Sequence, residues 1–193
     1  MDFLKNYDIV LASNSPRRRE LLGGLGIPYR VCVLRDIDES YPDTLQGEEI
    51  PLYISRKKAA AYENMLESRT LLITADTIVW LDGRVYGKPH DNAEACAMLR
   101  ALSGKTHTVI TGVAIRTRTK EVSFAVSTEV SFAALSDEEI DYYVTRFSPL
   151  DKAGAYGIQE WIGYVGVNGI RGSYFNVMGL PIHRLYQELK NNF

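Results

Sequence analysis

Residues 70–81, TLLITADTIVWL, form the stretch that decides the fold. Aliphatic and β-branched residues fill it over the length of one long strand, and Asp82-Gly83 directly after it predicts a tight turn into a short hairpin partner. Asp76 stands in the middle of this strand, with apolar residues on both sides. Such a carboxylate must be paired, bind a cation or line a site, so a structural pairing with Thr74 or a backbone amide and a chemical role both stay open.

Strand and helix patterns alternate on the N-terminal side of this stretch. Apolar runs predict strands over residues 7–13 and 29–34, and helical periodicity predicts helices over 15–25 and 48–67. The acidic, turn-prone residues 36–48 indicate a loop.

The C-terminal side is richer in strands. Residues 106–117 and 121–132 predict a long antiparallel pair. Capping boxes at Asp91 with Glu94 and at Ser136 with Glu139 predict two helix starts, and residues 180–192 predict a terminal amphipathic helix. The sequence therefore predicts an α/β fold with a mixed sheet, and its 193 residues fit one domain or two closely joined lobes.

Composition narrows the class of protein. The 193 residues are 46% hydrophobic and 24% charged, and the formal net charge of -2 gives no general attraction to nucleic acid or acidic membranes. No run approaches the roughly 20 apolar residues needed to cross a bilayer, and the first residues, MDFLKNYD, lack the pattern of a signal peptide. Cys32 and Cys96 predict buried, reduced thiols. We therefore expect a soluble, cytoplasmic protein that binds neither membranes nor specific nucleic acid sequences.

Three arginines stand at an unfavourable place. Ser15 and Pro16 predict a helix start, so residues 17–19 lie in its first turn, where the helix dipole disfavours cations by roughly 0.3–1 kcal/mol each. Beside unsatisfied backbone N–H groups, such cations make a strong anion site, and Arg17 or Arg18 can bind phosphate through a two-pronged fork. A solvated charge cluster is the alternative, and for Arg19 it is the better account.

Lys58 lies within the apolar row of its predicted helix, unlike its basic neighbours Arg56 and Lys57. Its stem can snorkel to water, or its ammonium can project into a cleft, and both interpretations stay open. Lys88 and Glu39 are ordinary loop residues when considered alone. Together, the cations and the two carboxylates on separate segments predict a site for a polyphosphate and a metal.

Other catalytic motifs are absent from the sequence. His90, His107 and His183 lack the spacing of a zinc site. There is no GxSxG, no Walker GxxxxGK[ST], and no GxGxxG after a strand.

Seven stretches along nearly the whole chain carry family signatures: LASNSPRRRELL (11–22), DIDES (36–40), KKAAAY (57–62), ITADTIVWLDGRVYGKP (73–89), LSGKTHTVITGVAI (102–115), LDKAGAYGIQ (150–159) and GIRGSYFNVMGLP (169–181). With them the sequence resembles the Maf family of nucleoside triphosphate pyrophosphatases. The S-x-SPRR signature and the DKAGAYGIQ block are specific. The ADT and GIQ pair is similar to the branch that acts on dTTP and UTP rather than the branch that prefers 7-methyl-GTP.

The resemblance implies a role for each matching residue. Asp76 would be the proton acceptor, and Glu39 with Asp76 would hold a divalent cation, Mg²⁺ or Mn²⁺. Thr77 and Gln159, together with Arg17, would discriminate the base. The residues that would contact the phosphates are Ser13, Arg17, Arg18, Lys58 and Lys88.

The resemblance also implies a fold and an activity. A mixed twisted sheet flanked by helices would be shared by two lobes around a central cleft, in a single domain over residues 1–193, as in inosine triphosphatase-like proteins. The enzyme would hydrolyse dTTP and UTP to the nucleoside monophosphate and pyrophosphate, act on modified pyrimidine nucleotides as well, and form a homodimer. The alternatives are a broad house-cleaning pyrophosphatase and a non-catalytic nucleotide-binding regulator of cell division. Asp76 and Glu39 argue against the regulator, because a sensor needs no general base.

Overall fold

The computed structural model describes residues 2–193 and divides into two compact units. The first unit contains the described residues up to Asp76 together with residues 111–126 and 179–193, and the second contains residues 77–110 and 127–178. Three long strands contribute residues to both units: β3 (Thr70–Leu81), β5 (Thr106–Arg116) and β6 (Glu121–Phe132). The prediction of one domain around a central cleft stays a prediction.

The sheet is mixed, as predicted. Across residues 2–193 its strands follow the order β2-β1-β3-β5-β6-β7, with β4 pairing to β3. In the first unit, β1 (Asp8–Leu11) runs parallel to both β2 (Arg30–Val31) and β3, with Ile9 opposite Leu71. In the second unit, β4 (Arg84–Tyr86) and β7 (Val167–Arg171) form antiparallel pairs with β3 and β6.

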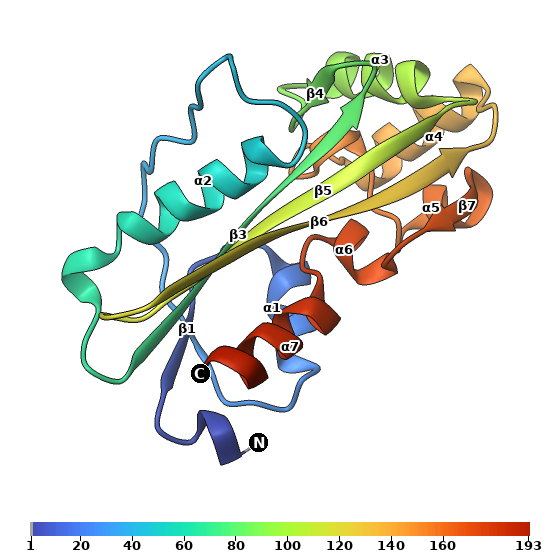
Figure 1. Ribbon diagram of the computed structural model, residues 1–193. Helices are drawn as coiled ribbons and strands as arrows, with labels where there is room; N and C mark the ends of the chain where they lie inside the picture. Colours follow the sequence, from blue (N-terminus) through green and yellow to red (C-terminus); the bar gives the residue numbers. More distant parts are fainter. Residues whose placement is uncertain (1) are drawn as a thin grey trace. The chain divides into compact units, whose positions relative to one another are not determined.

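Helices pack on the strands of the first unit. They are α1 (Pro16–Gly23), α2 (Glu49–Ala60) and α7 (Ile182–Asn192), with short 3-10 turns at Asp2–Leu4 and Glu63–Met65. Within this unit α2 covers one face of the strands, and α1 and α7 cover the other (Figure 1). A Cβ on Gly112 of β5 would lie 2.3 Å from the Pro51 carbonyl carbon, so only glycine lets α2 approach this closely.

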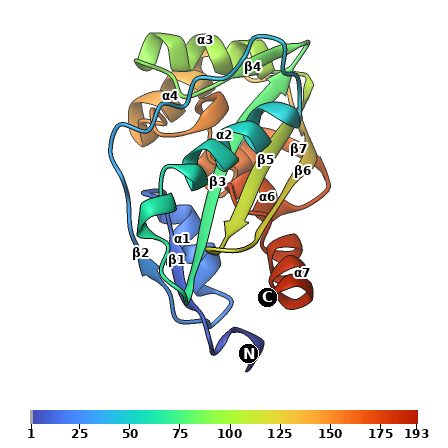
Figure 2. The same ribbon diagram turned by 60° about the vertical axis from the view of Figure 1, so that its left-hand side comes forward.

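The helices of the second unit begin where the sequence predicts. Asp91 caps α3 (Asn92–Leu102) by accepting from the Glu94 amide, and Ser136 and Glu139 form a complete capping box on α4 (Asp137–Phe147). α3 and α4 pack against each other (Figure 2). The remaining helical elements are a 3-10 turn at Ala153–Ala155, α5 (Trp161–Val165) and α6 (Tyr174–Met178).

The predicted strand over residues 29–34 is wrong beyond its first residues, because a side chain replaces its partner strand. Cys32 still donates its amide to the Leu11 carbonyl at 3.2 Å. The Tyr62 hydroxyl then donates to the Cys32 carbonyl at 3.1 Å and accepts from the Leu34 amide at 2.8 Å. Its ring is buried in a cluster that includes Val10 and Leu72, and burial raises the pKa of its hydroxyl.

The predicted end of the helix before Tyr62 also differs from the structure. The helix predicted over residues 48–67 ends at Ala60, and a 3-10 turn follows. The backbone leaves the helical region at Tyr62, with φ -94° and ψ 5°, as its side chain enters the core.

Cys32 and Cys96 carry free thiols and are half-buried rather than buried. Among residues 2–193, every helix is too short or too polar to span a bilayer.

Tyr62→Phe keeps the buried ring and removes the hydroxyl that holds residues 32–34. We expect the free energy of unfolding to fall by about 1–2 kcal/mol, because the Leu34 amide loses its acceptor. Urea denaturation followed by circular dichroism measures the change. Tyr53→Phe, at an exposed position on the preceding helix α2, is the control and should leave the stability unchanged. Equal stabilities for the two variants would contradict this role of the hydroxyl.

Candidate active site

The first turn of α1 is built as the sequence predicts. The Ser15 side chain accepts from the Arg18 amide, and Pro16 occupies the first helical position. Ser13 is buried, and its hydroxyl accepts from the Ser15 amide at 3.2 Å. These contacts fix the loop that joins β1 to α1.

The three arginines have three different environments. Arg18 is directed inward: its Nε donates to the Gly179 carbonyl and its Nη1 donates to the Ala75 carbonyl, both at 2.8 Å. Burial lowers the pKa of Arg18, and the negative charge of Asp76 opposes that effect. Arg19 contacts Asn14 and the Ser13 carbonyl, and Arg17 is half-buried. Arg18 therefore joins α1 to the β3 backbone directly before Asp76.

Lys58 ends between two carboxylates. Its Nζ lies 2.8 Å from Asp76 Oδ1 and 3.1 Å from Glu39 Oε1. The side chains of Lys58 and Asp76 are only 14% and 12% exposed, so the ammonium is paired rather than surrounded by water. The alternative of a snorkelling lysine is therefore wrong.

The same strand shows why Asp76 needs that lysine. Thr74, which shares its face of β3, donates its hydroxyl to the Ser55 carbonyl of α2 at 2.7 Å rather than to Asp76. The structural pairing that the sequence left open is therefore an ion pair with Lys58, and α2 supplies it.

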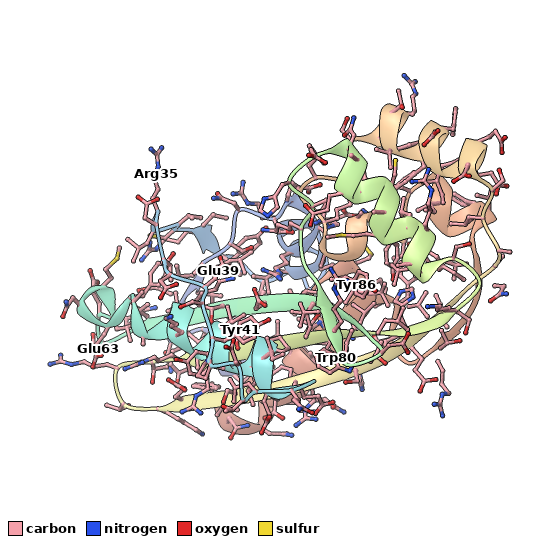
Figure 3. The ribbon with its side chains drawn as sticks, turned by 90° about the horizontal axis from the view of Figure 1, so that it is seen from above. Arg35, Glu39, Tyr41, Glu63, Trp80 and Tyr86 are labelled. Atoms are coloured by element: carbon pink, nitrogen blue, oxygen red, sulfur yellow. The ribbon has the colours of Figure 1, made fainter. Side chains whose placement is uncertain are left out.

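Lys57 holds the loop that carries Glu39. Its Nζ lies 2.7 Å from Asp38 Oδ2 and 3.0 Å from the Ser40 carbonyl oxygen. The hydrogen bond from Lys57 holds the pKa of Asp38 well below its ordinary value. Figure 3 shows Arg35, at the start of this loop, turned outward. The adjacent lysines thus have separate roles, and the sequence analysis missed the role of Lys57.

The two carboxylates fit a divalent cation that arrives with a phosphorylated ligand. Asp76 and Glu39 face one cationic group and supply hard oxygen donors. Within residues 2–193 there is no cluster of three or more histidine, cysteine or acidic side chains that could hold a metal ion. Mg²⁺ commonly takes one or two carboxylates and completes its shell with water and substrate phosphates, so this donor set is sufficient.

The other predicted site residues belong to the second unit. Lys88 is exposed in the loop after β4, and the Gly87 carbonyl in that loop accepts from the Gly154 amide at 3.0 Å. Gly154 has φ +68°, and a Cβ there would lie 2.7 Å from a Val79 methyl group. Glycine at this position therefore brings the GKP and DKAGAYGIQ segments together.

Gln159 and Thr77 are half-buried. The side-chain oxygen of Gln159 is buried and has no hydrogen-bond partner among residues 2–193. A buried acceptor without a donor is a costly arrangement, and it suits a residue that awaits a ligand group. Thr77 directly follows Asp76 on β3.

The sequence analysis also missed Lys152. It is buried, with Nζ 2.7 Å from Asp151 Oδ1 and 3.2 Å from Glu160 Oε1. Its place within the specific DKAGAYGIQ block was the signal that could have identified it. The structure thus gathers Ser13, Arg18, Glu39, Lys58 and Asp76 in the first unit, and it joins the loops of Lys88 and Lys152 in the second.

Comparisons with known proteins agree with this pattern. Residues 8–192 match the family model for Maf-like proteins. The chain is 64% identical over 190 residues to a dTTP/UTP pyrophosphatase from Phocaeicola vulgatus, covering 98% of each sequence. It is 56% identical over 193 residues to a dTTP/UTP pyrophosphatase from Porphyromonas gingivalis, covering 99% of this chain and 97% of that protein.

A solved structure confirms the predicted fold class. A HAM1 protein from Coxiella burnetii superposes with a TM-score of 0.51 at 17% identity, over 95% of this chain and 98% of that chain. At this identity the likeness concerns the fold alone.

His107 supports the glycine-rich segment of the second unit from within its core. It is 1% exposed, its Nε2 lies 2.7 Å from the Tyr156 hydroxyl, and its ring packs edge-on against Phe132. Burial lowers the pKa of His107 from its ordinary 6.5 to about 4. The folded protein therefore keeps the His107 ring neutral at neutral pH.

Acidification should destabilise the protein through His107. Between pH 6.5 and 4 the unfolded chain binds a proton at this histidine and the folded chain does not, so stability is full above pH 6.5 and falls by about 3 kcal/mol towards pH 4. Urea denaturation across this range measures the slope. His107→Gln should flatten it, whereas His183→Gln, at an exposed position, should keep it. A slope that survives His107→Gln would show that other groups cause it.

Proposed function

Because the chain belongs to the Maf-like family, we propose that it is a nucleoside triphosphate pyrophosphatase that converts dTTP and UTP to the nucleoside monophosphate and pyrophosphate. The observation that carries the proposal is the buried Asp76, which shares Lys58 with Glu39. This arrangement would supply a general base, cationic charge and metal ligands within one unit. Identity of 56–64% with proteins named dTTP/UTP pyrophosphatase supports the choice of substrates.

The cationic residues would bind the triphosphate. Arg17 stands in the first turn of α1 beside Ser13, where backbone N–H groups also favour an anion. Arg18 contributes its charge from behind this turn while holding the β3 backbone. Lys58 is already fixed by two carboxylates, so little further ordering is needed when it contacts phosphate. Lys88 is the exposed cation of the second unit that we assign to the same substrate.

Asp76 would take the proton from the attacking water. Its position on β3 is rigid, because Arg18 holds the Ala75 carbonyl and Lys58 holds the carboxylate itself. A base fixed in this way can orient a water molecule for attack on the anhydride between the α- and β-phosphates. Asp76 and Glu39 would hold Mg²⁺ or Mn²⁺, which when bound neutralises charge on the phosphate oxygens.

Gln159 would read the base. Uracil and thymine present an N3–H donor between two carbonyl acceptors, and an amide carries one donor and one acceptor that can match two of these groups. Cytosine inverts the pattern at N3 and at position 4, which leaves polar groups unpaired. The buried, unpartnered Gln159 oxygen supports this role. We assign Thr77 and Arg17 to the same discrimination.

Activity on modified pyrimidine nucleotides, a cytoplasmic location and a homodimer stay predictions.

Asp76→Asn should lower the rate of pyrophosphate release from UTP with Mg²⁺ by about 10²–10⁴-fold, because the amide cannot accept the proton. A coupled phosphate assay measures the rate. Asp8→Asn, at an exposed carboxylate on β1 of the same unit, is the control and should retain the wild-type rate. UTP binding without pyrophosphate release by the wild-type protein would support the non-catalytic regulator, and a fully active Asp76→Asn would refute the assigned base.

Gln159→Ala should lower the ratio of UTP to CTP turnover by about tenfold or more, because the site loses the groups that distinguish the two bases. Comparison of kcat/KM for the two nucleotides measures the ratio. Gln187→Ala, at an exposed position on α7, should leave it unchanged. If Gln159→Ala also leaves it unchanged, the base is read elsewhere.

A further inference from the structure

A buried polar network surrounds the segment that carries Gln159. The Tyr143 hydroxyl of α4 donates to Glu160 Oε2 and accepts from the Gly157 amide at 3.0 Å. Glu160 Oε1 in turn lies 3.2 Å from Lys152 Nζ. Tyr143 is fully buried and Lys152 is 7% exposed. The network thus holds residues on both sides of Gln159.

This network is an expensive way to stabilise a core. A buried ion pair is often no more stable than apolar residues of the same volume, because both charges lose their hydration. Burial and the contact with Glu160 raise the pKa of the Tyr143 hydroxyl, so it remains a neutral donor. Stability alone therefore gives a weak reason for placing these groups here, whereas exact placement of the nearby backbone gives a strong one.

The backbone between these anchors is closely packed. A Cβ on Gly157 would lie 2.9 Å from the Glu160 carboxyl carbon and 3.1 Å from Lys152 Cε. On the other side, a Cβ on Gly163 of α5 would lie 1.8 Å from the Ile158 carbonyl oxygen. Residues 157 and 158 are therefore held between the network and α5.

Gln159 lies in a turn that this clamp holds. The Glu160 amide donates to the Gly157 carbonyl at 2.9 Å and so closes the turn that contains Gln159. The network holds the Glu160 carboxylate through Tyr143 and Lys152. Because the Tyr143 hydroxyl also accepts from the Gly157 amide, both ends of this turn are fixed.

An amide cannot separate uracil from cytosine unless its orientation is fixed. Rotation of the Gln159 side-chain amide by 180° exchanges its donor and its acceptor, and the exchanged amide matches cytosine as well as the first orientation matches uracil. Selectivity therefore requires that the amide is presented where one orientation meets the base, and this requires a backbone that does not move. The clamp around residues 157–160 holds that backbone.

We propose that Tyr143, Lys152 and Glu160 are positioning residues for base selectivity, acting by holding the Gln159 segment in one orientation. This inference rests on the proposed pyrimidine nucleotide pyrophosphatase activity and assigns to it residues that do not themselves touch the base. Loss of the network should let the Gln159 amide satisfy cytosine, so CTP turnover should rise relative to UTP turnover.

The test is Tyr143→Phe, with kcat/KM measured for UTP and CTP. We expect the UTP-to-CTP ratio to fall about tenfold, because discrimination depends on unpaired polar groups that a mobile amide can satisfy. The ring itself should stay in place, since it stacks on Phe147 with centroids 5.1 Å apart. Tyr142→Phe, at an exposed position on the same helix, should keep the wild-type ratio.

The ratio separates positioning from folding. A variant that only unfolds a fraction of the molecules loses activity equally on both nucleotides and keeps the ratio. Lys152→Met should lower the ratio as Tyr143→Phe does, and Lys152→Arg, which keeps the charge beside Glu160, should restore part of it. Binding of UMP and CMP, measured by calorimetry, should show the same loss of preference without any chemistry.

Two outcomes would overturn the inference, and they are distinguishable. If the wild-type enzyme prefers UTP while Tyr143→Phe and Lys152→Met keep that preference, the network has a structural role only. If the wild-type protein releases pyrophosphate from no nucleotide, the proposed function fails and this inference fails with it.

Discussion

One ammonium group between two carboxylates governs the organisation of the first unit. Asp76 interrupts an otherwise apolar strand, and an unpaired carboxylate at that depth would be strongly unfavourable. Lys58 compensates it only because α2 lies close enough, and the absence of a side chain at Gly112 permits that approach. Glu39 is the second carboxylate beside Lys58. Its loop is held by Lys57, which contacts the residues on either side of Glu39, Asp38 and Ser40. A helix, a strand and a loop therefore depend on the same charges.

The arginines at the start of α1 are also linked to Asp76, through Arg18. Arg18, which the helix dipole disfavours, is stabilised by two backbone carbonyls and by the nearby charge of Asp76. Its guanidinium holds the carbonyl directly before Asp76, and Lys58 holds the carboxylate itself, so Asp76 is fixed through its backbone and through its side chain. The arginine cluster at the wrong helix end is thus partly a scaffold, and Arg17 remains the member that we assign to the substrate.

Local patterns in the sequence predicted most of the elements, and one helical face indicated Lys58, the lysine that pairs with Asp76. The strand with Asp76, the turn at Asp82-Gly83 and the cap at Ser136 follow from spacing and propensity over a few residues. The early end of β2 at Val31 follows instead from contacts with Tyr62, 28 and 30 positions away. The buried position of Lys152 follows from its ion pair with Glu160, which lies outside the regular elements. A single sequence does not show which distant residues will come into contact, because any polar side chain of the right length could form such a hydrogen bond or ion pair.

The Tyr62 hydroxyl also limits the extent of the sheet at its β2 edge. By taking the Cys32 carbonyl and the Leu34 amide, it ends the ladder beside β1 after a few residues and sends the chain off towards α2. β2 pairs with Val10 and Leu11, the last two residues of β1, and this ladder stops just before Ser13 and the α1 turn begin. The carboxyl ends of parallel strands are where α/β proteins usually bind ligands, so a single phenol group sets the border of the sheet beside that edge.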